Sequence, residues 1–371
     1  MTPLARLRRF WLDVHLWIGA GLLVALMPLA VTGSILVWHD QIDHALYASR
    51  YATGGGTASR PVSGYAEAAQ QAFGDRARIT QIRLPRTPGD PVVAVGRLTG
   101  PPGPGGRPRT LNAWINPPDA RVLDTAEVNA QATMVIHRLH GSLLIPDVGR
   151  KAVGWLGWAM FVSSSTGVWL WWPRHGGVLK GLRWRRGGST LFNLHHLVGF
   201  WVSLPLAVLS LTGVYISFPQ TSHALLGAPP PPQRPAGPGR NAPPITPRMP
   251  VDAVVAVSGG GAVREVTYPA RGPTPAWRIV LEGPAGETTT VRVVDATGEA
   301  KPGPDRAAGP PRQADPTSKL MRQIHDGTDM GLVWRLIITL AGLAPALLGV
   351  TGLIMWLRRS ARRRAVVRGR A

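Results

Sequence analysis

The stretch LHHLVGFW, residues 194–201, and the stretch VHLWIGAG, residues 14–21, each place a histidine at the start of a long apolar run. An ionisable side chain in such a run is costly in a membrane and marks a functional site. His15 and His195 are therefore the first candidates for function.

The chain contains an internal repeat, which the spacing between histidines and Thr-Gly pairs reveals. A Thr-Gly pair lies near the end of each of four apolar runs, where small residues let helices approach closely. Equal spacings indicate that the first half of the chain is repeated by the second. The pairs are His15 and Thr32 (17 positions apart), His195 and Thr212 (17), His140 and Thr166 (26), and His325 and Thr351 (26).

Four apolar runs predict four transmembrane helices. Each run holds roughly 20 or more residues, enough to cross a hydrocarbon core of about 30 Å. Equivalent helices run in the same direction, which predicts a pseudo-two-fold axis along the membrane normal. The runs are residues 11–38, 152–173, 196–218 and 332–357.

The charge of the chain indicates its orientation. The 371 residues carry a formal charge of +21, and the arginines cluster at 6–10, 173–188 and 358–370, beside the apolar runs. Cytoplasmic loops carry excess Lys and Arg, so both termini and the middle loop are expected in the cytoplasm. Clusters that adjoin membrane spans favour contact with the lipid bilayer over nucleic-acid binding. The chain has no cysteine, which excludes disulfides and cysteine-ligated iron–sulfur clusters.

The two long segments between spans predict small α+β modules, because their apolar residues alternate with period two after a short helical stretch. The fold class expected is thus a membrane protein with four transmembrane α-helices in a tandem-duplicated bundle and two periplasmic α+β modules. The expected segments are a cytoplasmic N-terminus (1–10), helix one (11–38), module one (39–136), helix two with its periplasmic approach (137–173), a cytoplasmic loop (174–190), helix three (191–218), module two (219–320), helix four with its approach (321–357) and a basic cytoplasmic tail (358–371).

The four repeated histidines predict two haem sites. A two-fold axis brings His15 opposite His195 at the cytoplasmic side, and His140 opposite His325 at the periplasmic side. Paired imidazoles between bundle helices suit bis-histidine ligation of two b-type haems. Zinc is the rival metal, but it usually needs four ligands. Two histidines on one iron leave no vacant position, which favours electron transfer over oxygen chemistry.

Further residues are weaker candidates. His196 adjoins His195 but points about 100° away on a helix, so both cannot bind one iron. His137 lies one turn before His140 and is either an alternative ligand or a contact to a haem propionate. Arg138 and Arg322 precede the periplasmic histidines and match propionate carboxylates. His39 and His44 follow the first apolar run and have only partial counterparts in the second repeat.

Together, "RLHG" (138–141), "TGVWLWWPR" (166–174), the "LHHLVGFW…LSLTG" helix and module ends "DARVLD" and "DATGEA" resemble the PepSY-associated transmembrane family over nearly the whole chain. The resemblance implies four membrane helices alternating with periplasmic PepSY-like modules. It also implies an inner-membrane, di-haem ferric siderophore reductase with ligands His15, His195, His140 and His325. The Pro/Gly-rich insertions of the modules depart from the family's pattern.

The expected function is transfer of electrons across the bacterial inner membrane to a ferric siderophore in the periplasm. The cytoplasmic segments are too short to fold a flavin or nicotinamide domain, so the electron donor is expected to be a separate cytoplasmic protein or a quinol. Two alternatives stay open. One is a haem-b subunit that passes electrons to another periplasmic protein, and the other is a non-redox, membrane-anchored PepSY protein that binds or regulates.

Overall fold

The computed structural model divides the chain into two compact units, each described by itself below. The first comprises residues Met1–His39, Ile136–Pro231 and Pro316–Ala371, and the second comprises Asp40–Val135 and Pro232–Asp315. The residues that the structure describes are 2–103, 108–173, 182–183, 189–226, 242–302 and 316–368. Most of the predicted cytoplasmic loop 174–190 therefore lies outside the described residues.

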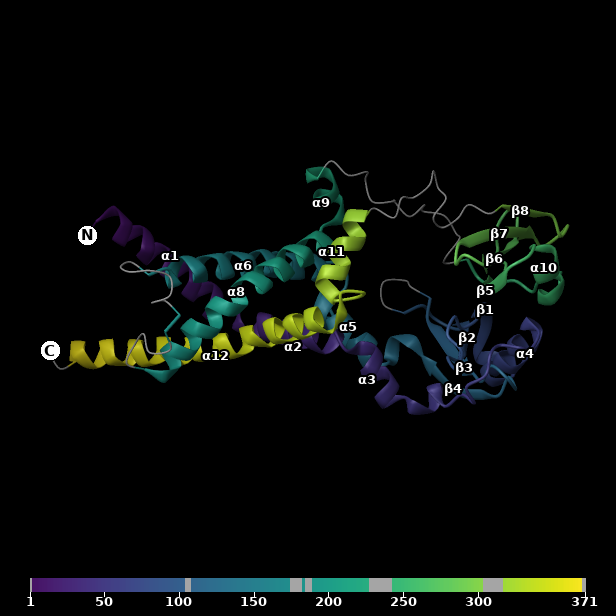
Figure 1. Cartoon of the computed structure of the whole chain (residues 1–371), viewed down its shortest axis with the longest axis horizontal. Helices are drawn as coiled ribbons and strands as arrows, with labels where there is room; N and C mark the ends of the chain where they lie inside the picture. The colour runs from purple at the N-terminus through teal and green to yellow at the C-terminus, as the bar shows by residue number, and fades with distance from the viewer. Residues whose placement is uncertain are drawn as a thin grey trace. The chain divides into compact units, whose positions relative to one another are not determined.

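The first unit is helical, and its long helices run side by side (Figure 1). Helix α6 packs against α8, while α2 and α8 both pack against α12. Glycines at these contacts leave no room for a Cβ: Gly154 of α6 faces Phe218, and Gly342 of α12 faces Ser34. The helices are α1 (Pro3–Gly21), α2 (Leu23–Leu36), α5 (Ala132–Ser142), α6 (Gly149–Trp171), α8 (Thr190–Ser217), α9 (Pro219–Leu225), α11 (Pro316–Asp326) and α12 (Gly331–Arg368).

Two of the described helices are long and apolar enough to cross a membrane, namely α8 and the Gly331–Arg362 part of α12. The pair α1 and α2 passes the same test only when both helices are taken together, which raises the number of candidate spans to three. Helix α6 has 23 residues but contains glycines, serines and tryptophans that lower its apolar character. The chain is thus a membrane protein with two or three candidate spans, where the sequence predicts four.

The first predicted helix, residues 11–38, is broken in the structure. Helices α1 and α2 meet at an angle of 70°. Leu22 between them leaves the helical conformation, with φ −102° and ψ 3°, directly after Gly21. The repeat-equivalent helix α8 is continuous from Thr190 to Ser217. The two repeats share their spacing but not the shape of this helix.

The second unit is built on one sheet of eight strands in the order β4-β3-β2-β1-β5-β6-β7-β8. Strands β1 and β5 pair antiparallel, from Gln81 opposite Thr267 to Arg83 opposite Glu265, and so join the two predicted modules in one sheet. The sequence did not indicate this union, and it missed the edge strands β4 and β8. The strands are β1 (Ala77–Arg83), β2 (Val92–Leu98), β3 (Thr110–Ile115), β4 (Val122–Glu127), β5 (Ala262–Thr267), β6 (Ala276–Glu282), β7 (Thr288–Val294) and β8 (Ala300–Pro302).

Helices α4 (Val62–Phe73) and α10 (Val251–Val257) cover the core of this sheet, and α3 (His39–Leu46) precedes it. Alternate residues of β6 are buried, which is the pattern of a strand with one face in the core. Trp277 of β6 and Tyr65 and Phe73 of α4 are among the largest fully buried side chains. The alternation seen in the sequence thus reports correctly which face of β6 is covered.

Candidate functional site

The four repeated histidines lie in two pairs within the helical unit. His15 of α1 faces His195 of α8, with ring centroids 6.4 Å apart. His140 of α5 faces His325 of α11, with ring centroids 6.1 Å apart. The pairing predicted from the repeat is therefore the pairing that the structure has.

The Nδ1 atom of each histidine is held by a neighbouring helix. It lies within hydrogen-bond distance of a threonine hydroxyl, and the carbonyl three residues before that threonine accepts a bond from the same ring. The threonines are those of the four Thr-Gly pairs. The Nδ1 contacts are His15 with Thr166 Oγ1 (3.2 Å) and Ser163 O (3.1 Å), His140 with Thr32 Oγ1 (3.4 Å) and Leu29 O (3.0 Å), His195 with Thr351 Oγ1 (3.0 Å) and the Leu348 carbonyl, and His325 with Thr212 Oγ1 (3.0 Å) and Leu209 O (3.1 Å).

These contacts fix the tautomer of each ring. Every one of the four threonine hydroxyls donates its proton to the carbonyl four residues earlier in its own helix, as Thr212 does to Val208 at 2.9 Å. A hydroxyl whose proton is used this way offers only a lone pair, and a carbonyl can only accept. Nδ1 must therefore carry the proton, which leaves the lone pair of Nε2 for a ligand. Metal-binding histidines are held by the same kind of bond from their other ring nitrogen.

The glycine of each Thr-Gly pair lies against the same histidine ring. A Cβ added to Gly33 would lie 2.8 Å from His140 Cε1, and one added to Gly213 would lie 3.0 Å from His325 Cε1. The corresponding distances are 3.3 Å from Gly352 to His195 and 3.4 Å from Gly167 to His15. We call each Thr-Gly pair a histidine seat: the threonine hydroxyl accepts a hydrogen bond from the histidine ring, and the glycine, which has no Cβ, leaves room for that ring. The Thr-Gly pair occurs four times in the sequence, where it predicts only that helices pack closely.

The two pairs lie at different levels of the bundle. Helix α8 carries His195 of one pair, and 17 residues later it carries Thr212, which holds His325 of the other pair. At about 1.5 Å per residue these two positions are about 25 Å apart along the helix. Helix α8 therefore connects two sites separated by most of a membrane's thickness.

The donor set limits which group each pair can hold. Among the described residues there is no group of three or more His, Cys, Asp or Glu side chains that could bind a metal ion, so a four-coordinate zinc site is not formed from them. An imidazole nitrogen lies about 2 Å from a bound metal and about 1.1 Å from its ring centre, so two imidazoles on opposite sides of one metal have centroids about 6.2 Å apart. Both observed separations are close to this value.

Each histidine of the inner pair is followed one helical turn later by a glycine with little around it. Gly19, one turn after His15, has no atom within 4 Å of an added Cβ, and the equivalent Gly199 has only Leu348 at 4.0 Å. Burial lowers the pKa of His325 to about 4, so this imidazole is neutral at pH 7, as a metal ligand must be. A buried, neutral imidazole pair is compatible with a metal whose other ligands come from a planar macrocycle, as in bis-histidine haem.

The weaker candidates are not members of the two ring pairs. His196 stacks between Phe192, at 5.4 Å, and Trp171, at 6.0 Å, in an aromatic cluster. His137 and Arg322 are exposed, and Arg138 is half-buried on α5. His39 is exposed and its Nδ1 lies 2.9 Å from the carbonyl of Leu36, while His44, in the second unit, stacks on Tyr51.

One buried histidine escaped the sequence interpretation. His223 of α9 is buried, and its Nε2 lies 3.0 Å from Ser318 Oγ of α11. The repeat-equivalent of Ser318 is Thr133, whose hydroxyl donates to Asp43 at 2.9 Å. In each repeat, a hydrogen bond thus connects the short helix after the first histidine-bearing segment (α3 or α9) with the start of the helix that carries the second histidine (α5 or α11). The polar partner differs in type, which explains why sequence spacing alone did not reveal it.

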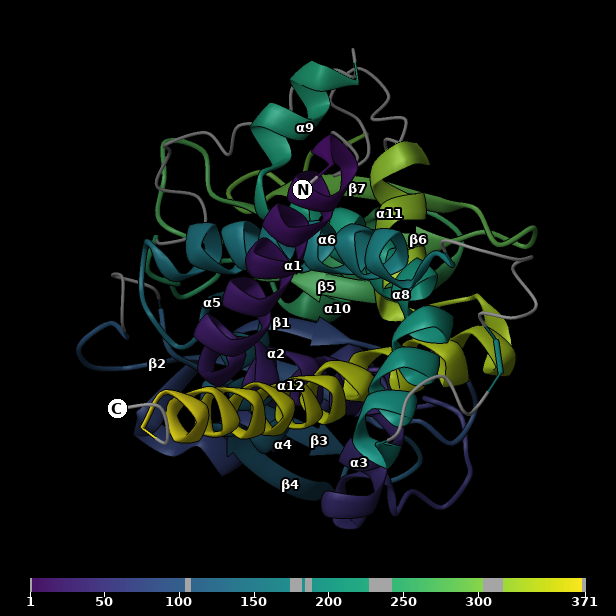
Figure 2. The same cartoon turned by 90° about the vertical axis from the view of Figure 1, so that its left-hand side faces the viewer.

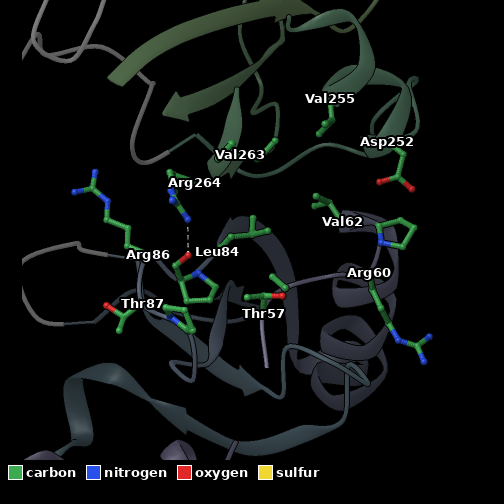
Figure 3. A pocket seen from close by; sticks show the side chains of 15 residues that line it. Thr57, Arg60, Val62, Leu84, Arg86, Thr87, Asp252, Val255, Val263 and Arg264 are labelled. Atoms are coloured by element: carbon green, nitrogen blue, oxygen red, sulfur yellow. Dashed lines mark hydrogen bonds between the residues drawn. The ribbon is translucent and has the colours of Figure 1, made fainter. Parts of the chain in front are cut away.

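The second unit contains a cavity of about 570 Å³ between its two halves (Figure 3). Its charged side chains bind other parts of the same unit. Arg264 donates to the Pro85 carbonyl at 2.6 Å and pairs with Glu282, and Asp252 accepts from the Ser63 amide at 3.1 Å. These contacts connect the two halves, and the cavity offers no histidine or paired carboxylates for chemistry. The histidine pairs are the stronger candidate site.

A family model described as PepSY-associated TM region matches residues 12–359, a range that includes all four paired histidines. No curated protein matches the chain.

Proposed function

The chain belongs to the PepSY-associated TM region family, and we propose that it is an inner-membrane di-haem reductase that carries electrons across the membrane to ferric siderophores in the periplasm. The observation that carries this proposal is the pair of two-histidine sites, each with Nδ1 fixed and Nε2 left for a metal. Their separation of about 25 Å along α8 supports a path across the bilayer.

We propose four membrane crossings, formed by the bent pair α1 and α2, by α6, by α8 and by α12. Helix α6 has 23 residues, about 34 Å at 1.5 Å per residue, which is long enough to cross in spite of its mixed composition. The arginines near the start of α1 and in the last turns of α12 support a cytoplasmic position for both termini. The second unit then lies in the periplasm.

In this proposal His15 and His195 hold the inner haem, and His140 and His325 hold the outer one. Bound haem supplies one-electron transfer between ferric and ferrous iron. The residues would set the conditions for that transfer: two imidazoles would hold each haem, which would favour electron transfer over oxygen chemistry. The threonine and carbonyl acceptors make each imidazole a stronger donor and keep its ring from rotating.

The substrate is a ferric siderophore, and it receives one electron per iron. Ferric ion is bound tightly by hard oxygen ligands, whereas the reduced ion has lower charge and is held more weakly. The electron comes from a cytoplasmic protein or a membrane quinol. Release of ferrous iron completes the reaction without direct coordination of the substrate iron by the protein.

The test is reoxidation of the dithionite-reduced protein in detergent after addition of a ferric siderophore, followed in the haem absorption bands. The wild type and the control His44→Ala should be reoxidised with one haem electron lost per ferric ion reduced. The His325→Ala variant should retain the inner haem but lose fast reoxidation. A wild type that holds haem but is not reoxidised by any ferric siderophore would refute the proposed substrate and favour an electron-transfer subunit for another periplasmic protein.

A further inference from the structure

Helix α1 has an exposed apolar face that no other part of its unit covers. Leu4, Leu7, Phe10 and Trp17 are exposed, with Trp17 at 69%, and their spacing of three and seven places them on one side of the helix. Arg6, Arg9 and Asp13 are also exposed and occupy the neighbouring arc of the helix, with Arg6 only about 20° from Trp17 at about 100° per residue. A helix with an apolar arc beside a charged arc is suited to lie in a membrane interface.

The bend after α1 supports the same orientation. Helix α2 has 14 residues, about 21 Å, and α1, inclined by 70°, adds about 10 Å, so together they still cross a core of about 30 Å. If α2 runs along the membrane normal, the 70° bend turns α1 toward the plane of the membrane. In Figure 2, which looks at the end of the unit where both termini lie, α1 lies across the view.

Charge indicates which molecules contact the charged arc. Arg6, Arg8 and Arg9 precede the first acidic residue of the chain, Asp13. Arg8 donates to the Leu170 carbonyl at the end of α6 and so fixes α1 against the bundle. Helix α12 packs against α1 and continues to Arg368 with further arginines and no acidic residue. A cationic surface beside an apolar face at a membrane boundary matches anionic phospholipid headgroups.

We propose that α1 lies in the cytoplasmic interface of the membrane, with Leu7, Phe10 and Trp17 among the acyl chains and Arg6 and Arg9 on the phosphate groups of anionic lipids. The lipid contact does not depend on the proposed function. Its effect on haem binding rests on that function: because His15 lies on the same helix, anionic lipid supports the position of this ligand against Thr166.

The test measures the depth of spin labels in nanodiscs. The chain has no cysteine, so Leu7→Cys, Trp17→Cys and the control Val24→Cys each carry one label. Over ten residues an interfacial helix inclined by 70° changes depth by about 5 Å, whereas a helix along the membrane normal changes depth by about 15 Å. We expect the smaller difference between Leu7 and Trp17, both labels near the acyl boundary, and a deeper label at Val24. A difference near the larger value, or a water-exposed label at Leu7, would overturn the proposal and leave the apolar face for a protein partner.

A second arm tests the lipid charge. The label at Leu7 is compared in phosphatidylcholine alone and in a mixture with phosphatidylglycerol, with Arg6→Gln/Arg9→Gln and, as control, Arg121→Gln. We expect the label to move toward water in phosphatidylcholine and in the double variant, but not in the control. Equal depth in all samples would overturn the role of anionic lipid. Both experiments measure the depth of a spin label and do not require haem. Their results therefore test the lipid contact even if the proposed function is wrong.

Discussion

The four histidine seats predict a graded response when each glycine is replaced by alanine. A relaxed carbon–carbon contact is about 3.6 Å, so the new Cβ must displace the ring by about 0.8 Å in Gly33→Ala and by about 0.6 Å in Gly213→Ala. The displacement is only about 0.3 Å in Gly352→Ala and about 0.2 Å in Gly167→Ala. Metal–ligand distances tolerate about 0.2 Å, so only the first two substitutions exceed this tolerance severalfold.

The assay is haem content per chain by pyridine haemochrome. Gly33→Ala and Gly213→Ala should each lower it by about one haem, and the double variant should lose no more, because both act on the His140–His325 pair. The two inner-site variants should keep both haems. Alanine favours a helix over glycine by about 1 kcal/mol, so a loss cannot come from weaker helix formation.

Gly141→Ala is the matched control, because it follows His140 directly but has no atom within 4 Å of the added Cβ. An equal haem loss in Gly141→Ala and Gly33→Ala, or a larger loss at the inner site than at the outer, would show that contact between the new Cβ and the histidine ring is not the cause.

Three further substitutions test other contacts. Thr212→Val removes the hydroxyl acceptor of the outer site but keeps its carbonyl, and should weaken outer haem affinity by about tenfold in a haem-transfer titration; an unchanged affinity would mean that the carbonyl suffices. Asp295→Ala leaves the indole of buried Trp277 without its acceptor at 2.8 Å, and should lower the free energy of unfolding of the second unit by about 2–3 kcal/mol in urea. Asp252→Ala removes the acceptor of the Ser63 amide at the start of α4 and should cost about 1 kcal/mol; a cost above that of Asp295→Ala would contradict the assignment of Asp295 as the more important acceptor.

The sequence revealed the parts of the site that depend on repeat spacing. Equal distances from each histidine to its Thr-Gly pair selected His15, His195, His140 and His325, and symmetry then predicted which rings face each other. The same spacing did not reveal that each threonine and glycine touch a histidine from another helix. That contact depends on helix packing, which no single-helix pattern contains.

Other features were missed for physical reasons that concern local geometry and long-range pairing. The bend at Leu22 follows from backbone angles at one residue after Gly21, whereas hydropathy predicts one continuous helix there. The union of two modules depends on pairing between β1 and β5, which are separated by a long stretch of chain. Edge strand β4 has every residue half-buried, so it lacks the alternation that identified its neighbours.

The proposed binding of two haems by the two histidine pairs is tested most directly by the absorption spectrum and pyridine haemochrome of the purified protein, expressed with ample haem supply, together with His195→Ala and His325→Ala. We expect two b-type haems per chain in the wild type, and the loss of one haem in each variant, the two variants lacking different haems. Absence of haem from the wild type, or loss of the same haem in both variants, would contradict it.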